Sequence, residues 1–241
     1  MMEELTGIKI CRIDNSQECR IIERVNKFVV KVEINGKHYR AYLNNTGILS
    51  EFLVHDRKAF CFKLPKQVKT DFRLFAIEER GLGALIDTHL QMKAFERSLE
   101  RNLILWLEGC GILKRNVTLG ASRIDYLLKC HGKAVYLEVK SAVLSDGEYA
   151  MYPDCPSERG RKHLKELTSY VNGGGEAIVL FIAALPMVKA FKPNKTADEK
   201  LYAELTRAHA SGVELRAIGL FYNPKNAYVS LFNSNLDMNF A

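Results

Sequence analysis

Apolar and polar residues alternate with period two over much of the first 85 residues, and this pattern predicts β-strands. In KFVVKVEINGKHYRAYL, residues 27–43, the Asn35-Gly36 pair predicts a two-residue turn that places Ile34 opposite Lys37. One face of this hairpin then carries the residues of a core: Phe28, Val30, Val32, Ile34, Tyr39, Ala41 and Leu43. Shorter strand patterns follow in RKAFCFKL and RLFAIEE. Together they predict a small closed all-β barrel over residues 1–85.

The opposite face of the same hairpin interleaves basic and aromatic side chains. Such a face can follow a phosphate backbone while its rings stack on bases, as OB-type barrels do. It can also be a solvated strand face. The candidate nucleic-acid contacts on it are Lys27, Lys31, His38, Arg40 and Tyr42.

Helical spacing replaces the alternation from about Leu85. In THLQMKAFERSLERNLILWLEG the recurring apolar positions predict one helix, and they are Met92, Phe95, Leu99, Leu103 and Trp106. Glu96 and Glu100 lie one turn apart on this helix, and we expect them to face solvent rather than to catalyse.

The rest of the chain alternates strands and helices. A hairpin over residues 123–141 is followed by a predicted loop, LSDGEYAMYPDCPS, and a helix, ERGRKHLKELTSYVNGG, that ends at Asn172-Gly173. The apolar run GEAIVLFIAAL predicts a central strand covered on both faces. A further helix, ADEKLYAELTRAHASG, and a strand, VELRAIGLF, follow. This order predicts a mixed α/β unit over residues 86–241.

On the helix that begins near residue 158, the predicted buried stripe consists of Gly160, Leu164, Leu167 and Val171. Arg159 and His163 lie one turn apart at the edge of this stripe. We expect the remaining basic residues of the helix to point outward, where they could contact nucleic acid: Arg161, Lys162 and Lys165.

The hairpin RIDYLLKCHGKAVYLEVKS places ionisable residues inside apolar strand patterns. The dipeptide His131-Gly132 suits a two-residue turn, because glycine and, less freely, histidine adopt positive φ. Asp125 then lies directly opposite Glu138, and Lys140 shares their face of the hairpin. A three-residue turn would shift the register by one and place the two acids on opposite faces.

Two carboxylates opposite each other in a ladder destabilise it unless something compensates their charge. A salt bridge from Lys140 or Arg123, or a solvated strand face, is one explanation. The other is a divalent cation, Mg²⁺ or Mn²⁺, held by Asp125, Glu138 and the backbone carbonyl of Val139, with waters completing an oxygen shell.

Composition sets weaker limits on the function. The formal net charge of +7 favours polyanionic partners. Six widely spaced cysteines form no C-x-x-C pair, and we expect free thiols in a reducing cytoplasm. No apolar run is long enough to span a membrane, and the start MMEELTG lacks signal-peptide features, so a cytoplasmic protein is expected.

Several longer motifs are more specific than the acidic pair. They are NNTG (44–47), RKAF (57–60), SRIDYLL (122–128), YLEVKS (136–141) and YPDCPSERGRKHLKEL (152–167). Together they resemble the sugar fermentation stimulation protein A family through nearly the whole chain. The resemblance implies an OB-like barrel joined to a restriction-endonuclease-like PD-(D/E)XK domain, a DNA-binding protein linked to sugar metabolism, and nuclease positions at Asp125, Glu138 and Lys140. The chain departs from the family at YPDC (152–155), commonly F-P-D-A, and at IDTHLQMKAFE, where an asparagine-containing segment is usual.

Two functions follow as hypotheses. The first is a metal-dependent phosphodiesterase in which Lys140 orients water, Arg159 clamps a phosphate and His163 assists proton transfer. Arg159 could instead pair with Asp154 or Glu158, and His163 could simply fill the helix stripe. The second is a DNA-binding regulator that does not cleave, because a nuclease fold can bind without turnover. The sequence leaves the oligomeric state open.

Overall fold

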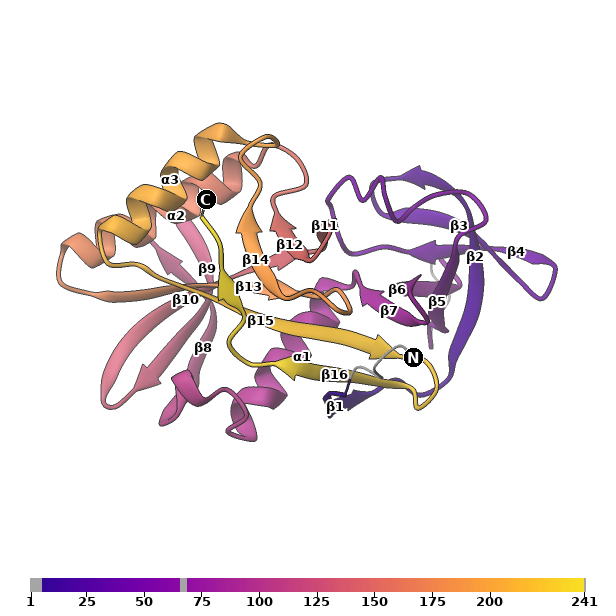
Figure 1. Ribbon diagram of the computed structural model, residues 1–241, viewed down its shortest axis with the longest axis horizontal. Helices are drawn as coiled ribbons and strands as arrows, with labels where there is room; N and C mark the ends of the chain where they lie inside the picture. Colours follow the sequence, from indigo (N-terminus) through magenta and orange to yellow (C-terminus); the bar gives the residue numbers. More distant parts are fainter. Residues whose placement is uncertain (1–5, 66–68, 241) are drawn as a thin grey trace.

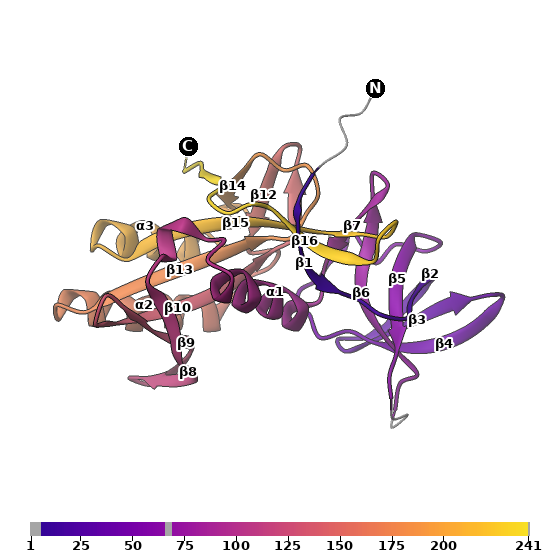
Figure 2. The ribbon, with the colours of Figure 1, turned by 90° about the horizontal axis from the view of Figure 1, so that it is seen from below.

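A computed structural model describes residues 6–65 and 69–240 of the chain. Five strands close a barrel in the order β4-β3-β2-β5-β6, and a parallel pairing of β4 with β6 completes it. They are β2 (Ser16–Asn26), β3 (Val29–Ile34), β4 (Lys37–Tyr42), β5 (Lys58–Lys63) and β6 (Phe72–Glu79). Figure 2 shows the barrel at one end of the molecule and the helices α2 and α3 at the other. The predicted barrel is confirmed.

The predicted β3–β4 hairpin is confirmed in register, with Ile34 opposite Lys37. Asn35 and Gly36 have φ angles of 51° and 72°, as a two-residue turn with positive φ requires. The predicted core face is buried except at two positions, Tyr39, which is half-buried, and Phe28 at its end. Phe28 was predicted on that face, but it lies in the turn before β3 and is 47% exposed.

The second unit is built on a sheet with the order β1-β16-β15-β13-β10-β9-β8, in which β10, β13 and β15 are parallel. Its strands are β1 (Ile8–Arg12), β8 (Cys110–Leu119), β9 (Ser122–Cys130), β10 (Lys133–Ala142), β13 (Glu176–Ala183), β15 (Glu214–Asn223) and β16 (Tyr228–Asn233). As predicted, β13 is central and buried on both faces. β7 (Leu82–Leu85) pairs with both β6 and β15, so the sheet is continuous with the barrel.

Helices cover both faces of this sheet. They are α1 (Thr88–Glu100), α2 (Glu158–Asn172) and α3 (Glu199–Ala210). Gln91 of α1 contacts Ser141 of β10, whereas His163 of α2 contacts Glu138 three residues earlier on the same strand. Because side chains alternate along a strand, α1 and α2 lie on opposite faces. Figure 1 shows α2 and α3 side by side, away from α1.

Three sequence expectations are corrected here. The helix predicted through Trp106 ends at Glu100, because Asn102 takes a φ of 53° and Leu103 N–H bonds back to Ser98 O. A short 3₁₀ helix, η1 (Leu105–Leu107), follows. The predicted loop after β10 contains two strands, β11 (Leu144–Asp146) and β12 (Tyr149–Tyr152). They belong to a small second sheet that β14 (Ala190–Pro193) and β17 (Asp237–Met238) complete. Finally, β1 lies before the barrel in sequence but pairs with β16 of the second unit.

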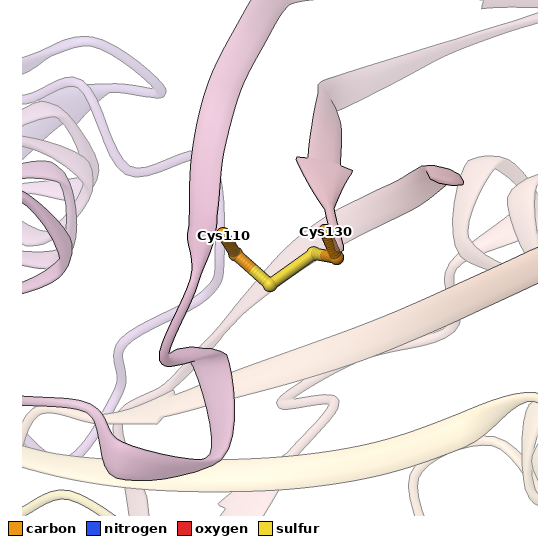
Figure 3. Close-up of a disulfide and its surroundings, with 2 residues drawn as sticks. All are labelled: Cys110 and Cys130. Atoms are coloured by element: carbon orange, nitrogen blue, oxygen red, sulfur yellow. A yellow bond between two sulfur atoms is a disulfide. The ribbon is translucent and has the colours of Figure 1, made fainter. Parts of the chain in front are cut away.

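The expectation of free thiols is wrong for two of the six cysteines. Cys110 of β8 and Cys130 of β9 are directly opposite in the ladder, with Cα atoms 4.1 Å apart, and form a disulfide (Figure 3). No strand was predicted over residues 110–119, so the pairing of Cys110 with Cys130 was not predicted either. Cys11, Cys19, Cys61 and Cys155 are free.

Candidate active site

The acidic pair lies where β9 and β10 stop pairing as a regular ladder. Their pairs run from Lys133–Cys130 to Leu137–Tyr126, which is the predicted register, and His131 and Gly132 both have positive φ. One step further, side chains replace the backbone pairing. Val139 N–H donates to Asp125 Oδ2 at 2.8 Å, and Asp125 N–H donates to Glu138 Oε2 at 3.3 Å. Each carboxylate therefore accepts a backbone amide of the other strand.

Glu138 is the centre of the cluster and is only 2% exposed. Its Oε1 accepts from Lys140 Nζ at 2.6 Å and lies 2.5 Å from His163 Nδ1. A buried carboxylate persists only with such partners, because burial without them costs several kcal/mol. Helix α2 supplies His163, and β10 itself supplies Lys140 two residues along the same face.

Arg159 determines which ring nitrogen of His163 accepts a hydrogen bond. Arg159 Nε lies 3.3 Å from His163 Nε2 and always carries a hydrogen, so Nε2 accepts. The ring hydrogen is therefore assigned to Nδ1, where it faces Glu138. Of the alternatives for Arg159, no pairing with Asp154 or Glu158 occurs within residues 6–65 and 69–240.

The pKa values of the cluster are pushed in different directions. Burial, followed by repulsion from Glu138, raises the pKa of Asp125 to about 6. For Glu138, burial opposes ionisation, but Lys140 and His163 outweigh it and the pKa is lowered. Burial would lower the pKa of Lys140, yet Glu138 outweighs it and the pKa is raised. Glu138 therefore favours the ammonium form of Lys140.

The donor set is suited to a hard divalent cation that keeps part of its water shell. The Asp125 carboxylate accepts one hydrogen bond from the described part of the chain and lies beside a second carboxylate, Glu138. No group of three or more His, Cys, Asp or Glu side chains able to hold a metal occurs among the described residues. Backbone and water oxygens would have to complete the shell, as Mg²⁺ allows.

Two protein-family models match most of the chain. A family model described as the sugar fermentation stimulation protein RE domain matches residues 89–226, and one described as the SfsA N-terminal OB domain matches residues 22–86. The chain belongs to the sugar fermentation stimulation protein family. The predicted fold class, an OB barrel followed by a mixed α/β domain, is confirmed.

Relatives in this family are similar over nearly their full length. A sugar fermentation stimulation protein homolog of Pyrococcus furiosus is 46% identical over 214 residues, which cover 88% of this chain and 92% of the relative. One of Archaeoglobus fulgidus is 46% identical over 229 residues, covering 95% and 98%. The solved structure of Pyrococcus furiosus SfsA in complex with Ca²⁺ is 41% identical with a TM-score of 0.93, covering 97% of this chain and 100% of that one.

Three basic residues of helix α2 were predicted to point outward, and the structure confirms this for two of them. Lys162 and Lys165 are exposed as expected. Arg161 is not directed outward, because its guanidinium lies 2.5 Å from Asp198 Oδ2 and its side chain is 20% exposed. The prediction for Arg161 is corrected: the ion pair joins α2 to the start of α3, where Asp198 caps the helix.

Those candidate nucleic-acid residues of the barrel that belong to β3 and β4 lie on one strand face, with Lys31 opposite Arg40. Lys27, in the turn before β3, is exposed. His38 Nε2 lies 3.7 Å from a Glu33 carboxylate oxygen. Tyr42 lies under the Arg73 guanidinium, 5.9 Å from the ring centroid. These side chains therefore lie on and beside the β3–β4 hairpin.

One buried polar residue near Lys140, Gln91, was not among the predicted site residues. Gln91 of α1 is 1% exposed, and its Nε2 donates to Leu85 O at 2.6 Å and to Ser141 Oγ at 2.9 Å. Ser141 directly follows Lys140, so α1 holds the end of β10 in place. The sequence signal that could have identified Gln91 is a polar residue on the buried side of a predicted helix. Glu96, expected to face solvent, is half-buried and bonds Arg115 and Tyr126.

Among the described helices, none is long and apolar enough to cross a membrane.

Proposed function

We propose that this protein binds DNA and hydrolyses its phosphodiester bonds with a divalent cation, Mg²⁺ or Mn²⁺, held by Asp125, Glu138 and the carbonyl of Val139. The observation that carries the proposal is the convergence of two carboxylates and Lys140 where β9 and β10 separate. A relative is described in complex with Ca²⁺, another hard cation with oxygen ligands. The match to an OB domain and the net charge of +7 support DNA as the partner.

A bound cation supplies a polarised phosphoryl oxygen and a water of lowered pKa. The chain's own residues do the rest. Glu138 favours the ammonium form of Lys140, which orients the attacking water and stabilises negative charge on the phosphate. His163 acts through Glu138, whose carboxylate it holds with Nδ1–H, rather than by exchanging protons with the substrate.

Arg159 has the geometry of a phosphate contact. It is exposed, and only its Nε is engaged by a described residue, at His163. The two terminal nitrogens remain to donate to a non-bridging phosphate oxygen, which guanidinium groups do in pairs of parallel hydrogen bonds.

The test is the substitution Glu138→Gln, which keeps size and hydrogen bonding but removes the charge that would hold the cation. In Mg²⁺ or Mn²⁺, wild type should cleave DNA, and the variant should lose cleavage by at least about 100-fold while DNA affinity stays within about twofold. Glu148→Gln, an exposed carboxylate paired with Lys189, is the matched control and should cleave normally. Undiminished cleavage by purified Glu138→Gln protein would refute the assignment.

A second function, DNA binding without cleavage, is favoured by one observation. Glu138 Oε1 is already occupied by both Lys140 and His163, which is what a purely structural ion pair needs. Under this alternative, wild type and Glu138→Gln both bind DNA and neither cleaves it with any divalent cation. Both functions require that affinity falls steeply as salt rises, because contacts to phosphates release counterions.

A further inference from the structure

Two large apolar side chains are exposed on neighbouring segments of the barrel. Phe28, in the turn between β2 and β3, is 47% exposed, and Ile48, in the segment after β4, is 54% exposed. A single exposed apolar residue is ordinary on a protein surface. These two differ because one arginine side chain ties their backbone segments together.

Arg24 of β2 makes that contact. Its guanidinium donates to the carbonyl oxygens of Lys27 at 3.1 Å, Gly47 at 2.8 Å and Ile48 at 2.6 Å. Its Nε donates to a further carbonyl, that of Asn26, at 3.3 Å. One side chain therefore ties the β2–β3 turn to the segment after β4. Phe28 and Ile48 are presented from a fixed frame, which lowers the entropy cost of ordering them against a ligand.

The same frame is joined to the loop that enters the candidate active site. Leu49 N–H donates to Asp154 Oδ2 at 3.2 Å, and a Cβ at Gly47 would clash with the Asp154 carboxylate, so only glycine permits this approach. Tyr152, two residues before Asp154, ends β12, and β12 packs against β10, the strand that carries Lys140. Two extended residues span at most about 7 Å. The frame that presents Phe28 and Ile48 is therefore joined through Asp154 to the strands of the candidate active site.

The charge around the pair points to a nucleic acid. Lys27 directly precedes Phe28 in the turn, and Lys31, three residues after Phe28, lies opposite Arg40 on the basic face of the β3–β4 hairpin. Rings and apolar side chains combined with basic groups form contacts for the faces of bases, which duplex stacking hides. The turn between the first two barrel strands is also a place where OB folds contact oligonucleotides.

We propose that Phe28 and Ile48, held by Arg24, contact the faces of unstacked bases, and that the substrate is DNA that is single-stranded or locally unpaired. This inference rests on the proposed DNA-binding function and specifies its substrate class. Base pairing and stacking are already broken in such DNA, so the apolar pair gains contact without that cost.

The test measures binding of the full chain to a single-stranded oligonucleotide containing 2-aminopurine, and to its duplex, in EDTA at low salt. Phe28→Ala should weaken single-strand binding about tenfold, as loss of one base stack does. Ile48→Ala should weaken it about threefold, and Phe28→Tyr should restore wild-type affinity. Leu113→Ala is the matched control, because Leu113 is 55% exposed on β8, and it should bind as wild type does.

The outcomes separate this inference from the proposed function. If wild type binds single strands and Phe28→Ala binds them as tightly as Leu113→Ala, the contact is overturned while DNA binding stands. If wild type binds duplex more tightly than single strands, the substrate class is overturned. If wild type binds neither form at low salt, the proposed function itself fails.

Discussion

Helix α2 contacts two buried carboxylate sites, and the protein compensates them to different degrees. Asp198 accepts hydrogen bonds from the Ser157 and Leu201 amides and from Arg161, at 2.5 to 2.9 Å. Burial opposes its ionisation, but these donors outweigh it and the pKa is lowered. Asp125 accepts one amide hydrogen bond and is repelled by a second carboxylate, and its pKa rises to about 6.

The two aspartates therefore differ in their role: Asp198 stabilises the fold, whereas the charge of Asp125 has fewer compensating donors. Asp198 caps α3 and ties it to α2, so its charge is used inside the protein. Asp125 and Glu138 share one face, where Lys140 and His163 both contact Glu138, and within the described residues Asp125 forms no ion pair. Under-compensated charge of this kind concentrates at functional sites.

The largest expected effect is on stability at the compensated site. Asp198→Ala leaves the buried Leu201 amide, the half-buried Ser157 amide and the Arg161 guanidinium without this acceptor. It also removes the α3 cap, so the free energy of unfolding should fall by about 3–5 kcal/mol. Urea denaturation measures this. Glu148→Ala, at an exposed ion pair, should change it by less than about 0.5 kcal/mol. A loss as small as the control's would remove the distinction between the two sites.

Asp125→Asn should do the opposite and raise the free energy of unfolding, by about 1–2 kcal/mol at pH 8 without divalent cations. An acid whose folded pKa is raised destabilises the fold above its unfolded pKa. The penalty grows between about pH 4 and the folded pKa of about 6, and it is complete above that. The gain of the variant over wild type should therefore vanish below about pH 4. A pH series of urea midpoints checks this, and a variant less stable than wild type at pH 8 would contradict it.

Divalent cations should stabilise the under-compensated site. At a Mg²⁺ or Mn²⁺ concentration ten times its Kd, wild type should gain about 1.4 kcal/mol of unfolding free energy, because the cation binds the folded state. Glu138→Gln should gain nothing, whereas Glu148→Gln should gain as wild type does. Calorimetric titration gives Kd, and thermal melts give the gain. Equal stabilisation of all three proteins would move the cation to another site.

The smallest expected effect on stability distinguishes the two arginines of α2. Arg159→Ala should change the free energy of unfolding by less than about 0.5 kcal/mol, because Arg159 is exposed and its one side-chain contact is His163. Arg161→Ala should cost about 2 kcal/mol, since it removes a hydrogen bond to the buried carboxylate of Asp198. In a cleavage assay, Arg159→Ala alone should lose substantial activity. Equal stability losses would show that both arginines are structural.

The site was predictable from sequence because its geometry is local. The turn at His131-Gly132 determines which residues face each other, so the positions of Asp125 and Glu138 followed from counting along two strands. The role of Arg161 was not predictable, because its partner Asp198 lies 37 residues away and no periodicity connects them. Helical spacing shows which side chains leave the core but not what they meet.

The fold was predictable where burial leaves a pattern. The strand β13 is buried on both faces and has an unbroken apolar run, whereas β8 is a largely exposed edge strand and has no clear alternation. Missing β8 also concealed the pairing of Cys110 with Cys130. The strands β11 and β12 are three and four residues long and pair with each other, and the strands that extend the sheet, β14 and β17, come from further along the chain.

The pairing of β1 with β16 has a consequence for how the protein is made. The barrel strands β2 to β6 are complete once residue 79 has left the ribosome, and they can pair among themselves. Ile8, however, pairs with Leu231. At usual translation rates, about 10 to 45 s separate the synthesis of these two residues. Throughout that interval β1 has an unpaired edge, so a nascent chain that stalls before β16 would expose a strand to other chains and to chaperones.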